Sequence, residues 1–233
     1  MSGYMNLIQN YLETIPINQL IIANKLHAEV FPSIPVSSYY KSLERCVRAK
    51  QLIHLTKGVY YRPRVTYLGI IPISELDITN FFIQNNQGML IGYRMFNKKG
   101  LTTQVSKQVN ILSTNITDNK KNLKNVNVSK IDIVLQDCTI STIETLEILQ
   151  NYNKIEDLNL RRLLAYMEKF ATMYSDDTIT HILKCRSYKK STLASLQAFL
   201  THYNVTNSLN QYLSPLSTYQ TIAVEELYEI TRE

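Results

Sequence analysis

Three cationic side chains follow one another at helical spacing in the segment SYYKSLERCVRAKQ. Lys41, Arg45 and Arg48 are separated by four and three positions, so they would form one stripe along an α-helix. Binding to double-stranded DNA requires cations that reach phosphates and short polar groups that touch base edges or the backbone, and Ser38 and Ser42 supply the second kind. The spacing predicts a DNA-binding helix in which Arg45 reads guanine N7 and O6, because its paired donors match these acceptors.

The next segment, LIHLTKGVYYRPR, has the composition of a β-hairpin. β-Branched and aromatic residues stand on both sides of the Lys57-Gly58 step, which supplies the turn. Lys57 lies at the tip, and Arg62 and Arg64 lie on the strand that leaves it. We expect these three cations to face a flanking phosphate or the minor groove.

The charge composition favours the DNA-binding interpretation. Residues 37–64 contain seven basic side chains and one acidic side chain, whereas a solvated surface normally mixes the two signs. The alternative is an ordinary solvated helix face, on which Glu44 and Arg48 form an i,i+4 ion pair worth about 0.3–0.5 kcal/mol. The net charge of +6 is uneven along the chain, with main blocks of +5 over residues 1–70, +7 over 94–130 and −4 over 131–233. Such asymmetry indicates that one part of the chain contacts a polyanion.

The elements around the basic segment predict how it is positioned. Apolar spacing indicates a first helix over residues 4–14 and a second helix over 20–26, capped by Asn18. A proline-punctuated stretch then precedes the third, basic helix, on which we expect Tyr39 to face outward with the cations. The residues expected to face the core from this helix are Tyr40, Leu43, Cys46, Val47 and Lys50. Three helices followed by a hairpin, over residues 1–66, predict a winged helix-turn-helix, whose third helix enters the major groove.

The remainder of the chain predicts a second domain over residues 73–233. Pro63–Pro72 indicates a connector, and Ser74 with Asp77 begins a helix through a capping box. The further elements expected are a short helix over 92–99, strands over 109–114 and 130–136 with an Asn/Lys-rich turn or hairpin region between them, and amphipathic helices from Thr142 onward. The predicted fold class is therefore α+β, an N-terminal winged helix-turn-helix followed by an α/β and mostly helical C-terminal domain.

The side chains that could support catalysis or metal binding do not form a constellation. His181 and Cys185 are spaced to share one helix face, but two ligands do not make a zinc site. Asp176 and Asp177 are explained by a helix N-terminus, which favours acidic residues. The sequence contains no GxGxxG, GxxxxGK[ST], GxSxG or HExxH motif. We therefore expect no enzymatic activity, no metal and no cofactor.

The cysteines and the apolar segments predict a cellular compartment. Cys46, Cys138 and Cys185 are odd in number and far apart, which predicts reduced thiols. No apolar run approaches the ~18 residues of a membrane span, and the N-terminus lacks the charged region and apolar core of a signal peptide. We expect a cytoplasmic protein without a membrane partner.

Three segments in order resemble the AbiEi-type antitoxin family. They are SLERCVRAKQLIHLTKGVYYRP, LGIIPISELDI and GLTTQVSKQVNILST, and the likeness covers roughly residues 1–140. The sequence departs from the family pattern at Ser106, where the family has proline, and at Lys50-Gln51, where it has glycine. Residues 141–233 match no part of that pattern.

The resemblance implies a function and partners. It implies a winged-helix DNA-binding domain, repression of the protein's own operon through inverted repeats, and a C-terminal domain that counteracts a nucleotidyltransferase-like toxin. It also implies that a positively charged surface contributes to antitoxicity, for which the candidates are Arg94, Lys98 and Lys99. We therefore expect a transcriptional autorepressor and antitoxin of a type IV abortive-infection toxin–antitoxin system, bound to its operator as two copies, with direct toxin binding left open. The alternative is a protein-interaction module or a transcriptional regulator without antitoxin activity.

Overall fold

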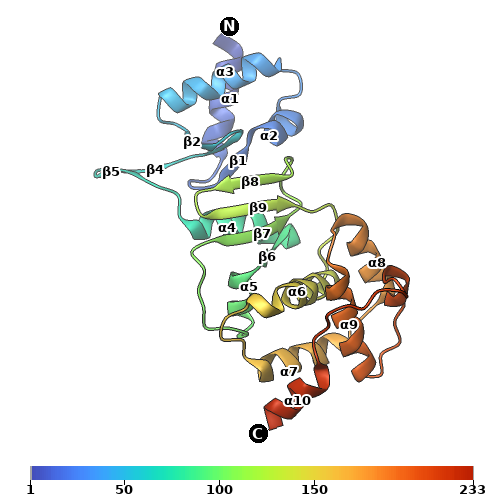
Figure 1. The fold of residues 1–233 in the computed structure, drawn as a ribbon. Coiled ribbons are helices and arrows are strands. Elements are labelled where there is room, and N and C mark those ends of the chain that lie inside the picture. Colours follow the sequence, from blue (N-terminus) through green and yellow to red (C-terminus); the bar gives the residue numbers. More distant parts are fainter. Residues whose placement is uncertain (1, 233) are drawn as a thin grey trace.

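The computed structural model describes residues 2–232 and shows a mixed α+β protein. Its elements form three successive parts: helices with a small sheet, a central four-stranded sheet, and a group of helices (Figure 1). The N-terminus lies at one end of the molecule and the C-terminus at the other (Figure 1). The predicted α+β class is confirmed.

The N-terminal part combines three helices with a three-stranded antiparallel sheet of order β1-β3-β2. Its elements are α1 (Ser2–Thr14), β1 (Leu20–Ile22), α2 (Ala23–Val30), α3 (Val36–Arg48), β2 (Ile53–Thr56) and β3 (Val59–Tyr61). The hairpin predicted around Lys57-Gly58 is confirmed by the pairing of β2 with β3. The second helix predicted over 20–26 is wrong at its start, because Leu20–Ile22 forms a strand. Asn18 has a φ of 63° and its N–H donates to the carbonyl of Arg62 at 2.8 Å, which turns the chain onto β3 instead of capping a helix.

Strands β1 and β3 of this small sheet are buried on both faces, whereas β2 is only partly buried. Side chains alternate along a strand, so Ile21 and Tyr60 point toward the three helices while Leu20 and Val59 point toward the central sheet. A strand covered on both sides needs apolar residues at every position, which explains the continuous runs LII and VYY.

The segment expected to be a plain connector forms a second hairpin instead. We call it the β4–β5 ribbon, residues 64–71, and its strands are β4 (Arg64–Thr66) and β5 (Gly69–Ile71). The two strands pair antiparallel, and Gly69 at the turn has a φ of 112°, a conformation that favours glycine. The ribbon extends away from the body of the molecule (Figure 1).

The central part is a four-stranded sheet of order β6-β7-β9-β8, in which β7 and β9 are parallel and the other pairs antiparallel. Its elements are α4 (Glu75–Ile83), η1 (Gln84–Asn86), β6 (Gly88–Ile91), α5 (Tyr93–Lys98), β7 (Val109–Ser113), β8 (Lys120–Leu123) and β9 (Val126–Lys130). The capping box of Ser74 and Asp77 is confirmed, and so is the strand near 109–114. The strand expected over 130–136 is wrong, because the Asn/Lys-rich region before it supplies the β8–β9 hairpin and the chain leaves the sheet after Lys130.

A continuous apolar core joins the N-terminal part to the central sheet. Leu20 and Val59 from the small sheet belong to the same buried cluster as Ile78 and Phe82 of α4 and Val109 of β7. This cluster crosses the boundary expected between residues 66 and 73.

The C-terminal part is helical, as the apolar periodicity predicts. Its elements are α6 (Asp137–Asn151), η2 (Tyr152–Lys154), α7 (Leu160–Ala171), α8 (Asp176–Cys185), α9 (Lys190–His202), η3 (Leu209–Tyr212) and α10 (Val224–Arg232). α6 lies at its centre, with Ile143 and Leu146 fully buried among the other helices. No helix within residues 2–232 is long and apolar enough to cross a membrane.

Candidate nucleic-acid interface

Helix α3 is held by a buried stripe that differs from the expected one. Tyr39, Leu43 and Cys46 are fully buried, whereas Tyr40 and Val47 are only partly buried. The expectation that Tyr39 faces outward is therefore wrong. Its hydroxyl donates to the carbonyl of Ala23 at 3.0 Å, and the enclosing core raises the pKa of this phenol.

The basic face of α3, which we define as Lys41, Arg45 and Arg48, lies on the opposite side and is exposed to solvent. Within the described part of the chain, no carboxylate lies at ion-pair distance from any of these three cations, and Glu44 does not pair with Arg48. Their charges are therefore not neutralised locally, which leaves them available to a polyanion.

The two serines expected beside these cations are not equivalent. Ser38 is partly exposed near the start of α3. Ser42 is buried, and its hydroxyl donates to the carbonyl of Ser38 at 2.9 Å. The expectation that Ser42 reaches DNA is wrong, because the helix is rotated so that Ser42 shares the buried stripe with Tyr39 and Cys46, three positions before it and four after it.

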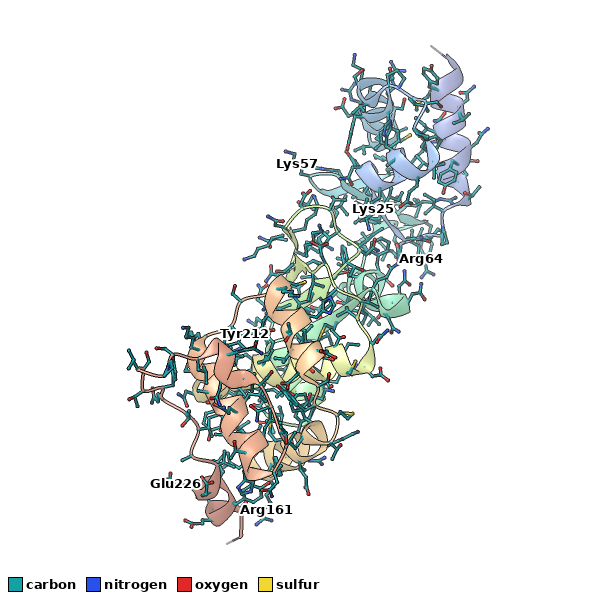
Figure 2. All side chains as sticks on the ribbon, turned by 90° about the vertical axis from the view of Figure 1, so that its right-hand side faces the viewer. Lys25, Lys57, Arg64, Arg161, Tyr212 and Glu226 are labelled. Carbon is teal, nitrogen blue, oxygen red and sulfur yellow. The ribbon has the colours of Figure 1, made fainter. Side chains whose placement is uncertain are left out.

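The tip of the β2–β3 hairpin carries one exposed cation and one internal contact. The side chain of Lys57 projects from the N-terminal part into solvent (Figure 2). Its backbone carbonyl accepts a hydrogen bond from Nζ of Lys121 at 2.6 Å, and the same ammonium pairs with Asp118 at 2.8 Å. The hairpin is thus fixed against β8, while the side chain of Lys57 is exposed to solvent.

Arg62 and Arg64 do not join this surface. Nη1 of Arg62 donates to the carbonyls of Glu13 and Ile15 at 2.6 and 2.9 Å, so it satisfies acceptors at the end of α1. The expectation that Arg62 faces phosphate is therefore wrong. Arg64 is exposed, but it belongs to the β4–β5 ribbon and lies across the N-terminal part from Lys57 (Figure 2).

Helix α2 makes two polar contacts that the sequence does not indicate. Nδ2 of Asn24 donates to Oγ1 of Thr117 at 2.8 Å, and Nζ of Lys25 donates to Oδ1 of Asn115 at 2.9 Å. Both contacts join the N-terminal part to the loop before β8, so they orient α3 and its hairpin relative to the central sheet. The partners are about ninety residues apart, and no local pattern could have paired them.

Most of the cations in the basic block over residues 94–130 contact other parts of the protein. Arg94 pairs with Glu75 at 2.8 Å, and Lys99 pairs with the buried Glu144 at 2.7 Å. Of the three residues expected on an antitoxicity surface, Lys98 is the exposed one, and it has no ion pair among residues 2–232. Other cations of this block with internal partners are Lys121 with Asp118, Lys124 with the carbonyl of Ile73, and Lys130 with Asp132.

The structure brings together no metal-binding group. In residues 2–232, no set of three or more His, Cys, Asp or Glu side chains is arranged to hold a metal ion. Cys185 contacts the carbonyl of Asp132, and Asp176 accepts hydrogen bonds from Tyr174 and Ser208. Asp176 therefore ties the start of α8 to the segment before η3.

No family model matches the chain, and no curated protein is similar enough to count as a relative.

Proposed function

We propose that this protein is a cytoplasmic DNA-binding repressor in which α3 enters the major groove and the β2–β3 hairpin lies beside the backbone. The basic face of α3 carries this proposal, because its three cations are exposed and have no ion pair in the described structure. The order α1, β1, α2, α3, β2, β3 supports a winged helix-turn-helix, which uses its third helix and hairpin in this way.

Each residue of the proposed interface has a distinct role. Arg45 reads a guanine, since its two donors match N7 and O6. Lys41 and Arg48 neutralise phosphates on either side, and Lys57 reaches a flanking phosphate from the hairpin tip. Arg62 and Ser42 have no part in it, because Nη1 of Arg62 and the hydroxyl of Ser42 bind the protein's own backbone.

The proposal is tested by measuring binding to the DNA upstream of the protein's gene over a salt series. We expect Lys41→Ala and Arg48→Ala each to reduce the log–log salt slope by about one, since each removes one phosphate contact. Arg45→Ala should cost about 1–3 kcal/mol on the specific site and relax the preference at one base pair.

Arg161→Ala is the matched control. Arg161 is an exposed arginine on α7, at the opposite end of the molecule from α3 (Figure 2). It should leave both the slope and the preference unchanged. Equal affinity for upstream DNA and random duplex, or equal effects of Arg45→Ala and Arg161→Ala, would refute the proposal.

We further propose that the repressor is the antitoxin of a toxin–antitoxin pair, countering a nucleotidyltransferase-like toxin. The support is the ordered resemblance of three segments to the AbiEi-type antitoxins. Co-expression with a nucleotidyltransferase encoded beside this gene should restore growth that the toxin alone arrests. Lys98→Glu, which reverses an exposed charge, should weaken this rescue without changing DNA binding. No rescue by the wild type would exclude the antitoxin role and leave the repressor role standing.

A further inference from the structure

The β4–β5 ribbon exposes apolar side chains to solvent. Tyr67 is 96% exposed, Leu68 83% and Val65 65%, and Ile70 and Ile71 are more than a third exposed. Within residues 2–232, β4 and β5 pair only with each other. The outer edge of each strand therefore carries backbone N–H and C=O groups without a strand partner.

A ribbon of this kind lacks the usual means of stability and protection. Two antiparallel strands alone are marginally stable in water and need a third strand or a packing surface. Exposed edges are normally protected by charged residues, yet the chain has none between Arg64 and Glu75. Pro63 and Pro72 flank the ribbon and confine strand pairing to the residues between them.

We infer that the β4–β5 ribbon pairs with the same ribbon of a second copy of this chain, forming an intermolecular antiparallel sheet about a two-fold axis. Two-fold symmetry places one edge strand antiparallel to the same strand of the second copy, so the two copies make identical contacts. Arg64 is the one charged side chain of the ribbon and residues 65–74 carry none, so two like ribbons repel little and offer no set of charges to a charged partner. Val65 and Ile70 are paired across the ribbon, so the joined sheet has a continuous apolar face.

A hollow at the base of the ribbon provides further contact surface for the second copy. It has a volume of about 320 Å³ and a mixed lining, with the apolar residues Leu12, Ile17, Pro63 and Val65 beside polar residues that include Glu13 and Lys50. The exposed apolar side chains of the ribbon supply on the order of several hundred Å² per copy, compared with about 800 Å² per partner in a standard interface. The expected dimer is therefore small and dissociates on dilution.

Sedimentation of the full-length protein without DNA, from low to high micromolar concentration, tests the inference. The wild type should show a concentration-dependent dimer. Tyr67→Ser combined with Leu68→Ser should raise the dimer Kd at least tenfold, with unchanged circular dichroism because both side chains are exposed. Leu216→Ser is the matched control, since Leu216 is 98% exposed on another part of the surface, and it should dimerise like the wild type.

Hydrogen exchange supplies a readout that needs no variant. Backbone amides of residues 64–71 should become more protected as the wild-type concentration rises, because the edges pair only in the dimer. A wild type that is monomeric throughout, or a dimer that the double variant and Leu216→Ser form equally, would overturn the inference.

The result of the dimerisation test can be distinguished from the result of the DNA-binding test. Arg45→Ala should dimerise normally, and the ribbon variant should keep the wild-type salt slope on a single half-site. Loss of DNA recognition alone would leave the ribbon pairing intact.

Discussion

Lys50 adopts a backbone conformation that favours glycine. Its φ is 59°, and its N–H donates to the carbonyl of Val47 at 3.0 Å, while the N–H of Gln51 donates to the carbonyl of Cys46 at 2.9 Å. This pair of hydrogen bonds is the Schellman motif that ends many helices. The AbiEi-type pattern has glycine at this place, and a side chain in the left-handed region costs about 1–2 kcal/mol.

Lys50→Gly is expected to raise the free energy of unfolding by about 0.5–1 kcal/mol, because glycine removes this strain at some cost in chain entropy. Lys50→Val should lower it, since a β-branched residue fits the left-handed region poorly. Urea denaturation measures both changes. Ala49→Gly is the control, because Ala49 has an ordinary φ of −78° and gains nothing from glycine. Equal destabilisation by Lys50→Gly and Ala49→Gly would contradict the explanation.

At the same scale, the sequence could identify the basic helix but not its exact rotation. Tyr39 and Tyr40 are adjacent aromatic residues, and either could begin an apolar stripe through Leu43 and Cys46. The acceptor at Ala23, on another helix, selects Tyr39 and thereby buries Ser42. Arg62 binds carbonyls that lie 47 and 49 positions earlier in the chain, so no local pattern indicates its role.

At the scale of elements, the contact between the β2–β3 hairpin and β8 depends on Lys121. Only 9% of Lys121 is exposed, although its neighbour Lys120 on the same strand is exposed. The hydrogen bond from Lys121 holds the pKa of Asp118 below its ordinary value. The carboxylate is therefore charged at neutral pH, and the stability from this pair is lost only as the pH falls through that lowered pKa.

Lys121→Met is expected to lower the free energy of unfolding by about 1–2 kcal/mol, because it removes the donor to Lys57 and the partner of Asp118. Hydrogen exchange at Gly58 and Val59 should accelerate as the hairpin loses this contact. Lys120→Met removes the same charge from the same strand. It should change the free energy of unfolding by no more than about 0.5 kcal/mol and leave the hydrogen exchange at Gly58 and Val59 unchanged. Equal effects of the two substitutions would show that Lys121 does not fix the hairpin.

The elements themselves were predictable to different degrees. Helices with long apolar periodicity, the capping box at Ser74 and the β2–β3 hairpin follow from local signals. Leu20–Ile22 was not predictable as a strand, because its partner β3 begins about forty residues later. The β4–β5 ribbon also escapes prediction, since Pro63 and Pro72 indicate a connector and no buried face produces an alternating pattern.

At the scale of the whole molecule, the N-terminal part and the central sheet are joined through one core. The small sheet is covered by α-helices on one face and by α4 and the central sheet on the other. The prolines and glycine near residues 66–73 predict a domain boundary there. They give no information about which side chains of the N-terminal part contact the central sheet. The cluster shared by Leu20, Val59 and Phe82 means that the position of α3 depends on the central sheet.

Phe82→Ala tests this dependence, since Phe82 is fully buried in α4 between the two sheets. The loss of a buried phenyl ring should cost about 3–5 kcal/mol. For a chain of this size that corresponds to a Tm lower by roughly 10 °C, measured by circular dichroism. Leu76→Ala in the same helix is the control, because Leu76 is 65% exposed and its truncation should stay within about 0.5 kcal/mol.

Hydrogen exchange distinguishes a joined structure from two independent domains in the same variant. If the core is shared, Phe82→Ala should lower the protection of amides in α3 and in β7 together. β7 contributes to the cluster that Phe82 fills, and α3 packs on the opposite face of the small sheet, whose Leu20 and Val59 lie in that cluster. Protection lost only in β7, with α3 unchanged, would mean that residues 1–66 fold alone. Joint loss would mean that the DNA-binding geometry proposed for α3 is set by residues beyond the boundary.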